Sequence, residues 1–298
     1  MPCTKEEAER IAWYTPDFPG DEPPPVLATC EPDPARPEQW RLDAYFEREP
    51  DSAALAVLSA LAPSAGAAPS VDALADENWV TLSQQGLEPI RAGRFFVHTA
   101  DHRGEVPAEA QALEIDAGRA FGTGHHETTA GCLIALDRLK QAGLAFDNIL
   151  DLGTGTGLLA FAALRLWPAA RGTASDIDLV AIDVAAANAA VNGIPLGAAR
   201  GQVELIAAPG LDEPLLQTRA PYDLVVANIL AGPLVELAPS VAEAMAPGAR
   251  LVLAGLLTVQ VEEVAAAYRR QGLTAAFRID RGDWAILAMR KRKALGWR

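Results

Sequence analysis

Residues 148–157 read Asn-Ile-Leu-Asp-Leu-Gly-Thr-Gly-Thr-Gly, and residues 173–178 read Thr-Ala-Ser-Asp-Ile-Asp after an apolar run. An apolar strand thus ends in an acid and a glycine-rich turn, a helix follows, and a second short strand ends in another acid. This order is the first half of a nucleotide-binding βαβ unit. Glycine has no Cβ atom, so Gly153 and Gly155 allow a tight turn and a close approach to a ligand. A purely structural turn between strand and helix remains the alternative.

Two acids and one leucine indicate which nucleotide binds. A dinucleotide fingerprint has a third small residue at the position where this chain has Leu158. Asp151, at the end of the first strand, would repel a pyrophosphate but attract a cation. Asp176, at the end of the second strand, can accept hydrogen bonds from the ribose hydroxyls of an adenosine. S-adenosylmethionine (SAM) carries adenosine, a sulfonium and an ammonium without phosphates, so we expect it as the cofactor.

Strand-like and helix-like segments alternate through the larger part of the chain. A strand at residues 95–99 is expected to open the larger domain. The alternation that follows predicts seven strands, at 149–152, 172–175, 203–206, 222–227, 250–254, 273–279 and 284–289, and helices at 128–141, 158–166, 179–192, 233–245 and 259–270. Alternation implies a parallel sheet covered by helices. The last two strands have no helix between them, so they form a hairpin and the final strand runs antiparallel. The prediction is an α/β, seven-stranded, Rossmann-like domain of the SAM-dependent methyltransferase type over residues 94–298.

The first 72 residues differ in character from the rest. Proline-rich turns separate an expected helix at 5–13, capped by Thr4, from strands at 26–30 and 39–46 and a helix at 52–61. This mixture predicts a small α+β domain over residues 1–72. Residues 73–93 are interpreted as a linker segment.

Asn228 directly follows the expected strand at 222–227, within Asn-Ile-Leu-Ala-Gly-Pro-Leu at 228–234. In amino-methylating enzymes of this fold, an Asn or Asp at this point presents carbonyl oxygens to the amine and orients its lone pair toward the methyl group. Asn228 is therefore the candidate residue for positioning the amine, and no general base is proposed. The alternative is that Asn228 only caps the helix that follows.

Residues 121–129, Phe-Gly-Thr-Gly-His-His-Glu-Thr-Thr, form a polar loop before an apolar helix. We expect this loop to fold over the methionine end of the cofactor, whereas a helix cap at Thr128 or Thr129 is the structural alternative. His125, His126 and Glu127 lack the His-Glu-x-x-His spacing of a zinc site, so no metal is expected.

Composition limits the partners and the compartment. The net charge of −14 argues against a nucleic-acid backbone and fits a basic protein partner, with the alternative that the acidity only keeps the protein soluble. Three scattered cysteines, the absence of a secretory signal and the lack of a long apolar span favour a reducing cytoplasm and no membrane association. No oligomeric state is indicated.

Together, the three segments at 121–129, 151–157 and 228–234 resemble the ribosomal protein L-eleven methyltransferase family. So do Asn78-Trp79, Pro247-Gly248 and residues 254–260, Ala-Gly-Leu-Leu-Thr-Val-Gln. The resemblance covers roughly residues 76–290. It implies a cytoplasmic SAM-dependent enzyme that trimethylates lysine ε-amines and the N-terminal α-amine of that large-subunit protein. It also implies SAM contacts at Thr129, Gly153, Asp176 and Asn228, with Thr123 nearby, and a substrate-gripping N-terminal domain.

Three other functions remain open at this point. A methyltransferase for another protein or a small amine is the nearest, because residues 1–72 resemble the family weakly. An NAD-linked oxidoreductase and a catalytically inactive SAM-binding adaptor are more distant. Adenine or side-chain-amide methylation is disfavoured because Ile229 and Leu230 follow Asn228 where those enzymes have Pro-Pro-Tyr.

Overall fold

The computed structural model describes residues 1–13, 16, 18, 25–30, 32, 39–46, 48–66, 68–72, 89–116 and 126–292. The chain divides into two compact units, Met1–Glu77 and Asn78–Arg298. No helix within these described residues is both long enough and apolar enough to cross a membrane.

The N-terminal unit is a small α+β fold with its own core. Its elements are β1 (Pro2–Thr4), α1 (Lys5–Trp13), β2 (Val26–Cys30), β3 (Gln39–Tyr45), α2 (Ser52–Leu61) and a 3-10 turn, η1 (Pro63–Ala65). The strands pair antiparallel in the order β1-β3-β2. Thr4 and Glu7 form a reciprocal capping box, in which each main-chain N–H donates to the other's side chain at 2.8 and 3.2 Å. Both expected helices and both expected strands are confirmed, whereas β1 was not expected.

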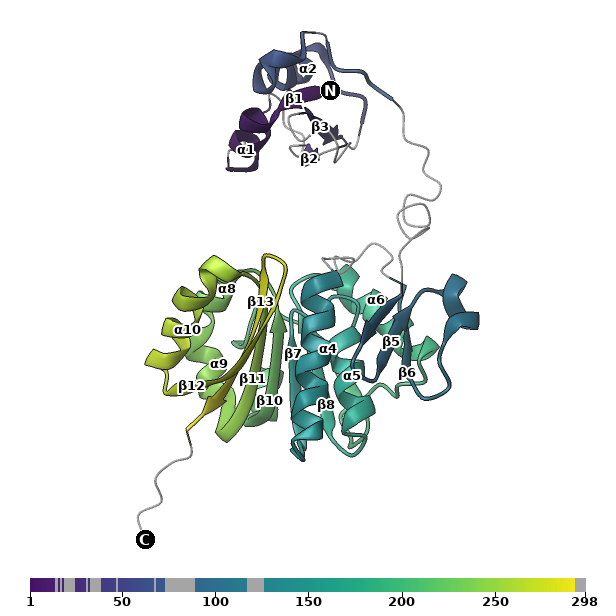
Figure 1. Cartoon of the computed structure of the whole chain (residues 1–298), viewed down its shortest axis with the longest axis vertical. Coiled ribbons are helices and arrows are strands. Elements are labelled where there is room, and N and C mark those ends of the chain that lie inside the picture. The colour runs from purple at the N-terminus through teal and green to yellow at the C-terminus, as the bar shows by residue number, and fades with distance from the viewer. Residues whose placement is uncertain are drawn as a thin grey trace. The chain divides into compact units, whose positions relative to one another are not determined.

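The larger unit is built on a seven-stranded sheet (Figure 1). Its strands are β7 (Asn148–Leu152), β8 (Arg171–Asp176), β9 (Val203–Ala207), β10 (Tyr222–Asn228), β11 (Met245–Leu257), β12 (Leu273–Arg281) and β13 (Trp284–Lys291). They lie in the order β12-β13-β11-β10-β7-β8-β9. β7 to β11 pair in parallel, and β13 pairs antiparallel with both β11 and β12. The predicted seven-stranded sheet with an antiparallel last strand is confirmed.

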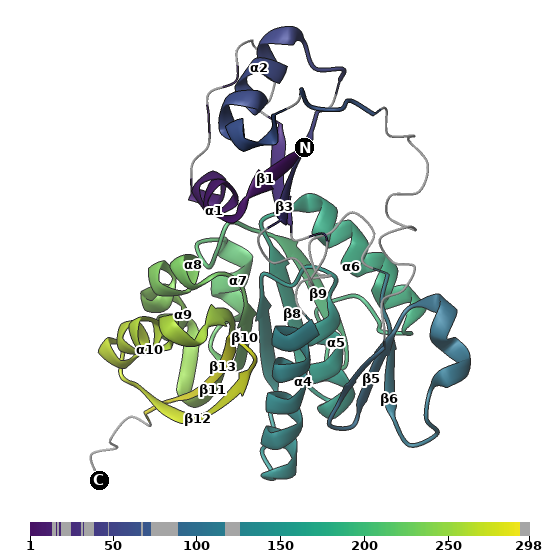
Figure 2. The same cartoon turned by 45° about the horizontal axis from the view of Figure 1, so that its top comes forward.

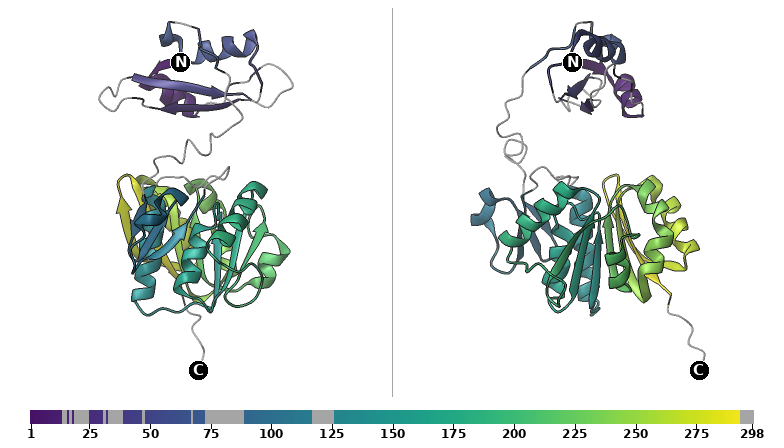
Figure 3. Two further views of the ribbon diagram at one scale, coloured as in Figure 1. Left: turned by 90° about the vertical axis from the view of Figure 1, so that its right-hand side faces the viewer. Right: turned by 180° about the vertical axis from the view of Figure 1, so that it is seen from behind.

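Helices cover both faces of this sheet (Figure 3). They are α4 (His126–Gln141), α5 (Leu158–Leu166), α6 (Leu179–Val191), α7 (Pro214–Arg219), α8 (Ala231–Glu236), α9 (Ala238–Ala244) and α10 (Val261–Arg270), with a 3-10 turn, η3 (Thr258–Gln260), before α10. In β10, Leu224 and Val226 join the core under α4 and α5, whereas Val225 and Ala227 join the core under α8 to α10. A strand that is buried on both sides has a continuous run of apolar residues, and this run is why β10 could be predicted from the sequence.

Two expectations about the helices were wrong. The single helix expected at residues 233–245 is divided into α8 and α9, because Pro239 lacks an N–H and stands in the first turn of a new helix. The short helix α7, which begins at Pro214, was not expected.

A second, three-stranded sheet belongs to the larger unit, as Figure 2 shows for β5 and β6. It consists of β4 (Ile90–Ala92), β5 (Phe95–His98) and β6 (Gln111–Glu114), with a 3-10 helix, η2 (Ala100–Glu105), between the last two. β4 falls inside the segment 73–93 that was interpreted as a linker, and it pairs antiparallel with β5. β6 was not expected, because four residues without strict alternation give no strand signal.

Candidate functional site

The expected site groups meet at the carboxyl ends of neighbouring parallel strands. After β7 the chain proceeds to β8 and β9 on one side, and then returns to place β10 on the other side of β7. Such a reversal of strand order is where open α/β sheets bind ligands. The glycine-rich turn follows β7, Asp176 ends β8 and Asn228 ends β10.

The backbone of the turn requires glycine. Gly153, Gly155 and Gly157 have φ angles of +73°, +54° and +85°, which side chains with a Cβ rarely adopt. The main-chain N–H groups of Gly153 and Thr154 donate to the carbonyl oxygen of Ser175 at 2.8 and 2.9 Å, so the turn is fixed to β8. A Cβ on Gly153 would lie 2.3 Å from Cγ2 of Ile229, so the turn also packs tightly against the segment after β10.

Asp176 faces this turn from the end of β8. Its Oδ2 accepts a hydrogen bond from the N–H of Gly155 at 2.8 Å, and its Oδ1 accepts one from the N–H of Asp178 at 3.1 Å. A carboxylate has about four lone-pair sites, so two remain for hydroxyl donors. The arrangement can hold a ribose diol beside the glycine turn.

Replacing Asp176 with Ala is expected to weaken SAM binding by about 1–3 kcal/mol, because charge-assisted hydrogen bonds to the ribose are lost. Calorimetric titration with SAM measures this effect. Asp178→Ala is the matched control, since its carboxylate lies two residues away but caps α6 by accepting from Val180 N–H at 2.8 Å. The control should lose about 1 kcal/mol of stability and keep its SAM affinity. Parent affinity in folded Asp176→Ala would remove Asp176 from the site.

Asp151 is buried beneath the same turn, with 1% of its surface exposed. Its Oδ2 accepts from the Thr154 hydroxyl at 2.6 Å and from the Ala160 N–H at 3.0 Å. No group in the described part of the chain bonds to its buried Oδ1. Burial, aided by the charge of Asp176, raises the pKa of Asp151 from 3.8 to about 6, although its two hydrogen bonds oppose the shift. An uncompensated carboxylate of this kind fits a cationic ligand.

The raised pKa of Asp151 predicts pH-dependent cofactor binding. The folded protein holds the Asp151 proton more tightly than the unfolded chain. The protonated carboxyl group therefore favours folding below pH 4, and this contribution is lost as pH rises through about 6. Burial favours the protonated form of Asp151, whereas a cation bound beside it would stabilise the ionised form. SAM affinity should therefore fall as pH is lowered from about 7.5 to about 5.5, a range in which an α-amino group of pKa about 8 remains largely charged.

Titration calorimetry at both pH values, with the parent and with Asp151→Asn, measures this dependence. Asparagine can still accept from Thr154 and Ala160 through one oxygen, so the variant keeps the turn but has no proton to lose. Its SAM affinity should be weaker at neutral pH and nearly independent of pH. An equal pH dependence in both proteins would assign the effect to another group.

Asn228 is the last residue of β10 and is half-buried. Within the described chain, its side chain forms no hydrogen bond. The helix after it begins at Ala231, and Leu230 occupies the cap position without a side-chain bond, so the helix-cap alternative for Asn228 is wrong. Gly255, with φ +81°, supports this segment, because a Cβ there would lie 2.3 Å from the carbonyl oxygen of Ile229. The sequence did not reveal this close approach to Ile229, because Gly255 appeared there only as a glycine next to an expected strand.

The polar loop before α4 lies largely outside the described residues, and so do Thr123, His125 and Asn78-Trp79. The helix itself begins at His126, so Thr128 and Thr129 lie inside its first turn and neither is the cap. Both threonines are buried. Glu127 is exposed and accepts from Nε of Arg281 at 2.6 Å.

Among the described residues no group of three or more metal-binding side chains gathers. Since His125 lies outside them, the expectation that no metal binds stays a prediction.

A seven-stranded sheet of this topology, with a glycine turn and an acidic strand end at its switch point, defines the class: this is a SAM-dependent methyltransferase. Comparison with known proteins identifies the family. The model of the ribosomal protein L11 methyltransferase family matches residues 25–292, and the chain belongs to that family.

Individual relatives agree with this assignment. A ribosomal protein L11 methyltransferase from Brucella suis is 42% identical over 251 residues, which are 84% of this chain and 85% of the relative. One from Caulobacter is 43% identical over 253 residues, or 85% of this chain and 83% of the relative. The crystal structure of a ribosomal protein L11 methylase from Lactobacillus delbrueckii subsp. bulgaricus shares the fold, with a TM-score of 0.57 and 24% identity over 68% of this chain and 97% of the other.

Proposed function

We propose that this enzyme transfers methyl groups from SAM to lysine ε-amines and the N-terminal α-amine of ribosomal protein L11. Membership of the family supports the reaction and the substrate, since the relatives carry that substrate in their names. Family membership also favours a methyltransferase over an NAD-linked oxidoreductase. The observation that carries the amine assignment is Asn228, which lies at the switch point beside the glycine turn and whose side-chain amide has no hydrogen-bond partner among the described residues.

In this proposal the chain itself contributes mainly positioning. The cofactor supplies an electrophilic methyl group. Gly153, Gly155, Asp151 and Asp176 would hold the cofactor, with a further contact from Thr129, whereas Thr123 lies outside the described residues. The Asn228 carbonyl oxygen accepts a hydrogen bond from the attacking amine and directs its lone pair toward the methyl group, which is catalysis by orientation.

The amine must lose a proton before it attacks. For a lysine of pKa about 10.4, deprotonation at pH 7 costs about 4–5 kcal/mol. Desolvation and a nearby positive charge both lower that pKa, so no dedicated base is required. Repeated methylation then needs only that the amine rotate and release further protons to water.

We propose that the enzyme acts in the cytoplasm and that its N-terminal unit binds the protein substrate. Residues 1–72 contain 14 acidic and 5 basic side chains, so a net charge of −9 is concentrated in a quarter of the chain. Ribosomal proteins are generally basic, and complementary charge accelerates and orients their association.

Mass spectrometry of ribosomal proteins tests the substrate. In cells lacking this enzyme, L11 should lose mass in steps of one methyl group, and the parent gene should restore it. A catalytically impaired Asn228→Ala gene should not. Unmodified L11 in parent cells, or a mass loss on a different protein, would redirect the proposal toward another protein or a small amine.

A further inference from the structure

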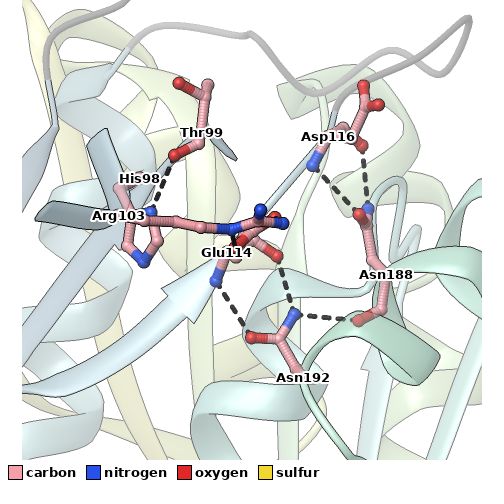
Figure 4. A network of polar contacts seen from close by, with 7 residues as sticks. All are labelled: His98, Thr99, Arg103, Glu114, Asp116, Asn188 and Asn192. Carbon is pink, nitrogen blue, oxygen red and sulfur yellow. Dashed lines mark hydrogen bonds and ion pairs between the residues drawn. The ribbon is translucent and has the colours of Figure 1, made fainter. Parts of the chain in front are cut away.

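Asn188 is a buried amide in the middle of α6, with 1% of its surface exposed. Its Oδ1 accepts from the N–H of Asp116 at 2.9 Å, and its Nδ2 donates to the carbonyl oxygen of the same residue at 2.9 Å (Figure 4). The Nδ2 also donates to the carbonyl oxygen of Thr156 at 3.1 Å. One side chain therefore joins the end of the β6 segment to the glycine turn.

Asn192 repeats the first part of this pattern one helical turn later. Its Oδ1 accepts from the N–H of Glu114 at 2.9 Å, and its Nδ2 donates to the Glu114 carbonyl oxygen at 2.7 Å. The remaining bond of Nδ2 is to the carbonyl oxygen of Asn188 at 2.8 Å, within α6 itself. Asn192 thus holds β6 without contacting the glycine turn.

The two asparagines can bond alternate residues of an extended chain because the spacing along the helix matches the spacing along the chain. Four residues of helix rise about 6 Å, and two residues of strand span about 6.6 Å. The amides consequently act as a substitute strand along the end of β6 and the two residues after it, satisfying the main-chain groups of Glu114 and Asp116.

Asp116 is the last described residue before residue 126, and Thr156 lies inside the turn that faces Asp176. We propose that Asn188 is a positioning residue that couples the Asp116 peptide to the cofactor-binding turn. In this role it holds the Thr156 peptide and the Asp116 peptide in one geometry, so binding at the turn also stabilises the chain at residues 115–116. The inference rests on the proposed placement of SAM at the glycine turn.

The test compares Asn188→Ala with Asn192→Ala, because each loses a pair of bonds to one main-chain peptide unit in residues 114–116 and only Asn188 reaches the turn. The melting temperature should fall by a similar amount in both variants. SAM affinity, measured by calorimetry, should fall about tenfold in Asn188→Ala and stay within about twofold of the parent in Asn192→Ala. The KM for SAM should follow the same split, with kcat for a short lysine peptide changing less. Equal losses of SAM affinity in both variants, or none in Asn188→Ala, would overturn the coupling.

Hydrogen exchange on the parent protein gives a second readout should Asn188→Ala not fold. SAM should protect the amides of residues 115–116 together with those of the turn at 153–157. Protection of the turn without residues 115–116 contradicts the proposal. Asp176→Ala distinguishes failure of the coupling from failure of the proposed SAM placement. If Asp176→Ala binds SAM as tightly as the parent, the placement of SAM at the glycine turn is wrong. If Asp176→Ala loses affinity but Asn188→Ala and Asn192→Ala bind SAM equally well, the placement stands and the coupling is wrong.

Discussion

Asn228→Ala is expected to lower kcat with lysine peptides by about 100-fold, the loss that misplacing a reacting group commonly causes. In the proposed function the Asn228 amide, which has no hydrogen-bond partner among the described residues, directs the amine. Steady-state assays with a short lysine-containing peptide measure kcat. Since no bond in the described chain depends on this side chain, the free energy of unfolding should change by less than about 1 kcal/mol.

A second variant tests whether turnover depends on where the Asn228 amide lies and not only on its presence. Gly255→Ala keeps Asn228 but places a Cβ 2.3 Å from the carbonyl oxygen of Ile229, at a φ of +81°. The segment after Asn228 must shift, so turnover should fall although the amide is present. If folded Asn228→Ala turned over at the parent rate, the amine-positioning role would be withdrawn.

Removal of the N-terminal unit is expected to abolish most methylation of intact L11 while leaving SAM binding near its parent value. A fragment beginning at Val71 keeps the glycine turn, Asp176 and Asn228, and the cores of the two units share no described residue. Tethering a substrate through a second contact raises the effective concentration of the target amine at the site. Losing that contact should therefore lower kcat/KM for the intact protein by about 100-fold or more.

A short peptide substrate is the control for this truncation. It is too small to use a separate grip, so the fragment and the full chain should methylate it at similar rates. Efficient methylation of intact L11 by the fragment would contradict the grip. An insoluble fragment would instead assign residues 1–72 the role of covering apolar surface.

The sequence by itself determined the large sheet and most of its helices, because those signals are local. β10 is apolar on both faces, and Gly153 and Gly155 follow a strand directly. The final hairpin also followed from local order, since no helix could be placed between β12 and β13. The acids at the two strand ends were identified for the same reason, as each is adjacent in sequence to its own strand.

Tertiary structure alone decided what depends on distant partners. Four residues in β6 become a strand because β5 pairs with one edge, and on the other edge the Asn192 amide bonds both main-chain groups of Glu114. Gly255 matters because the backbone of Ile229 passes against it, and the pKa of Asp151 is raised by burial, which the sequence does not display. Hydrogen bonds and desolvation are set by neighbours in space, so residues with ordinary local patterns acquired their roles only when the chain folded.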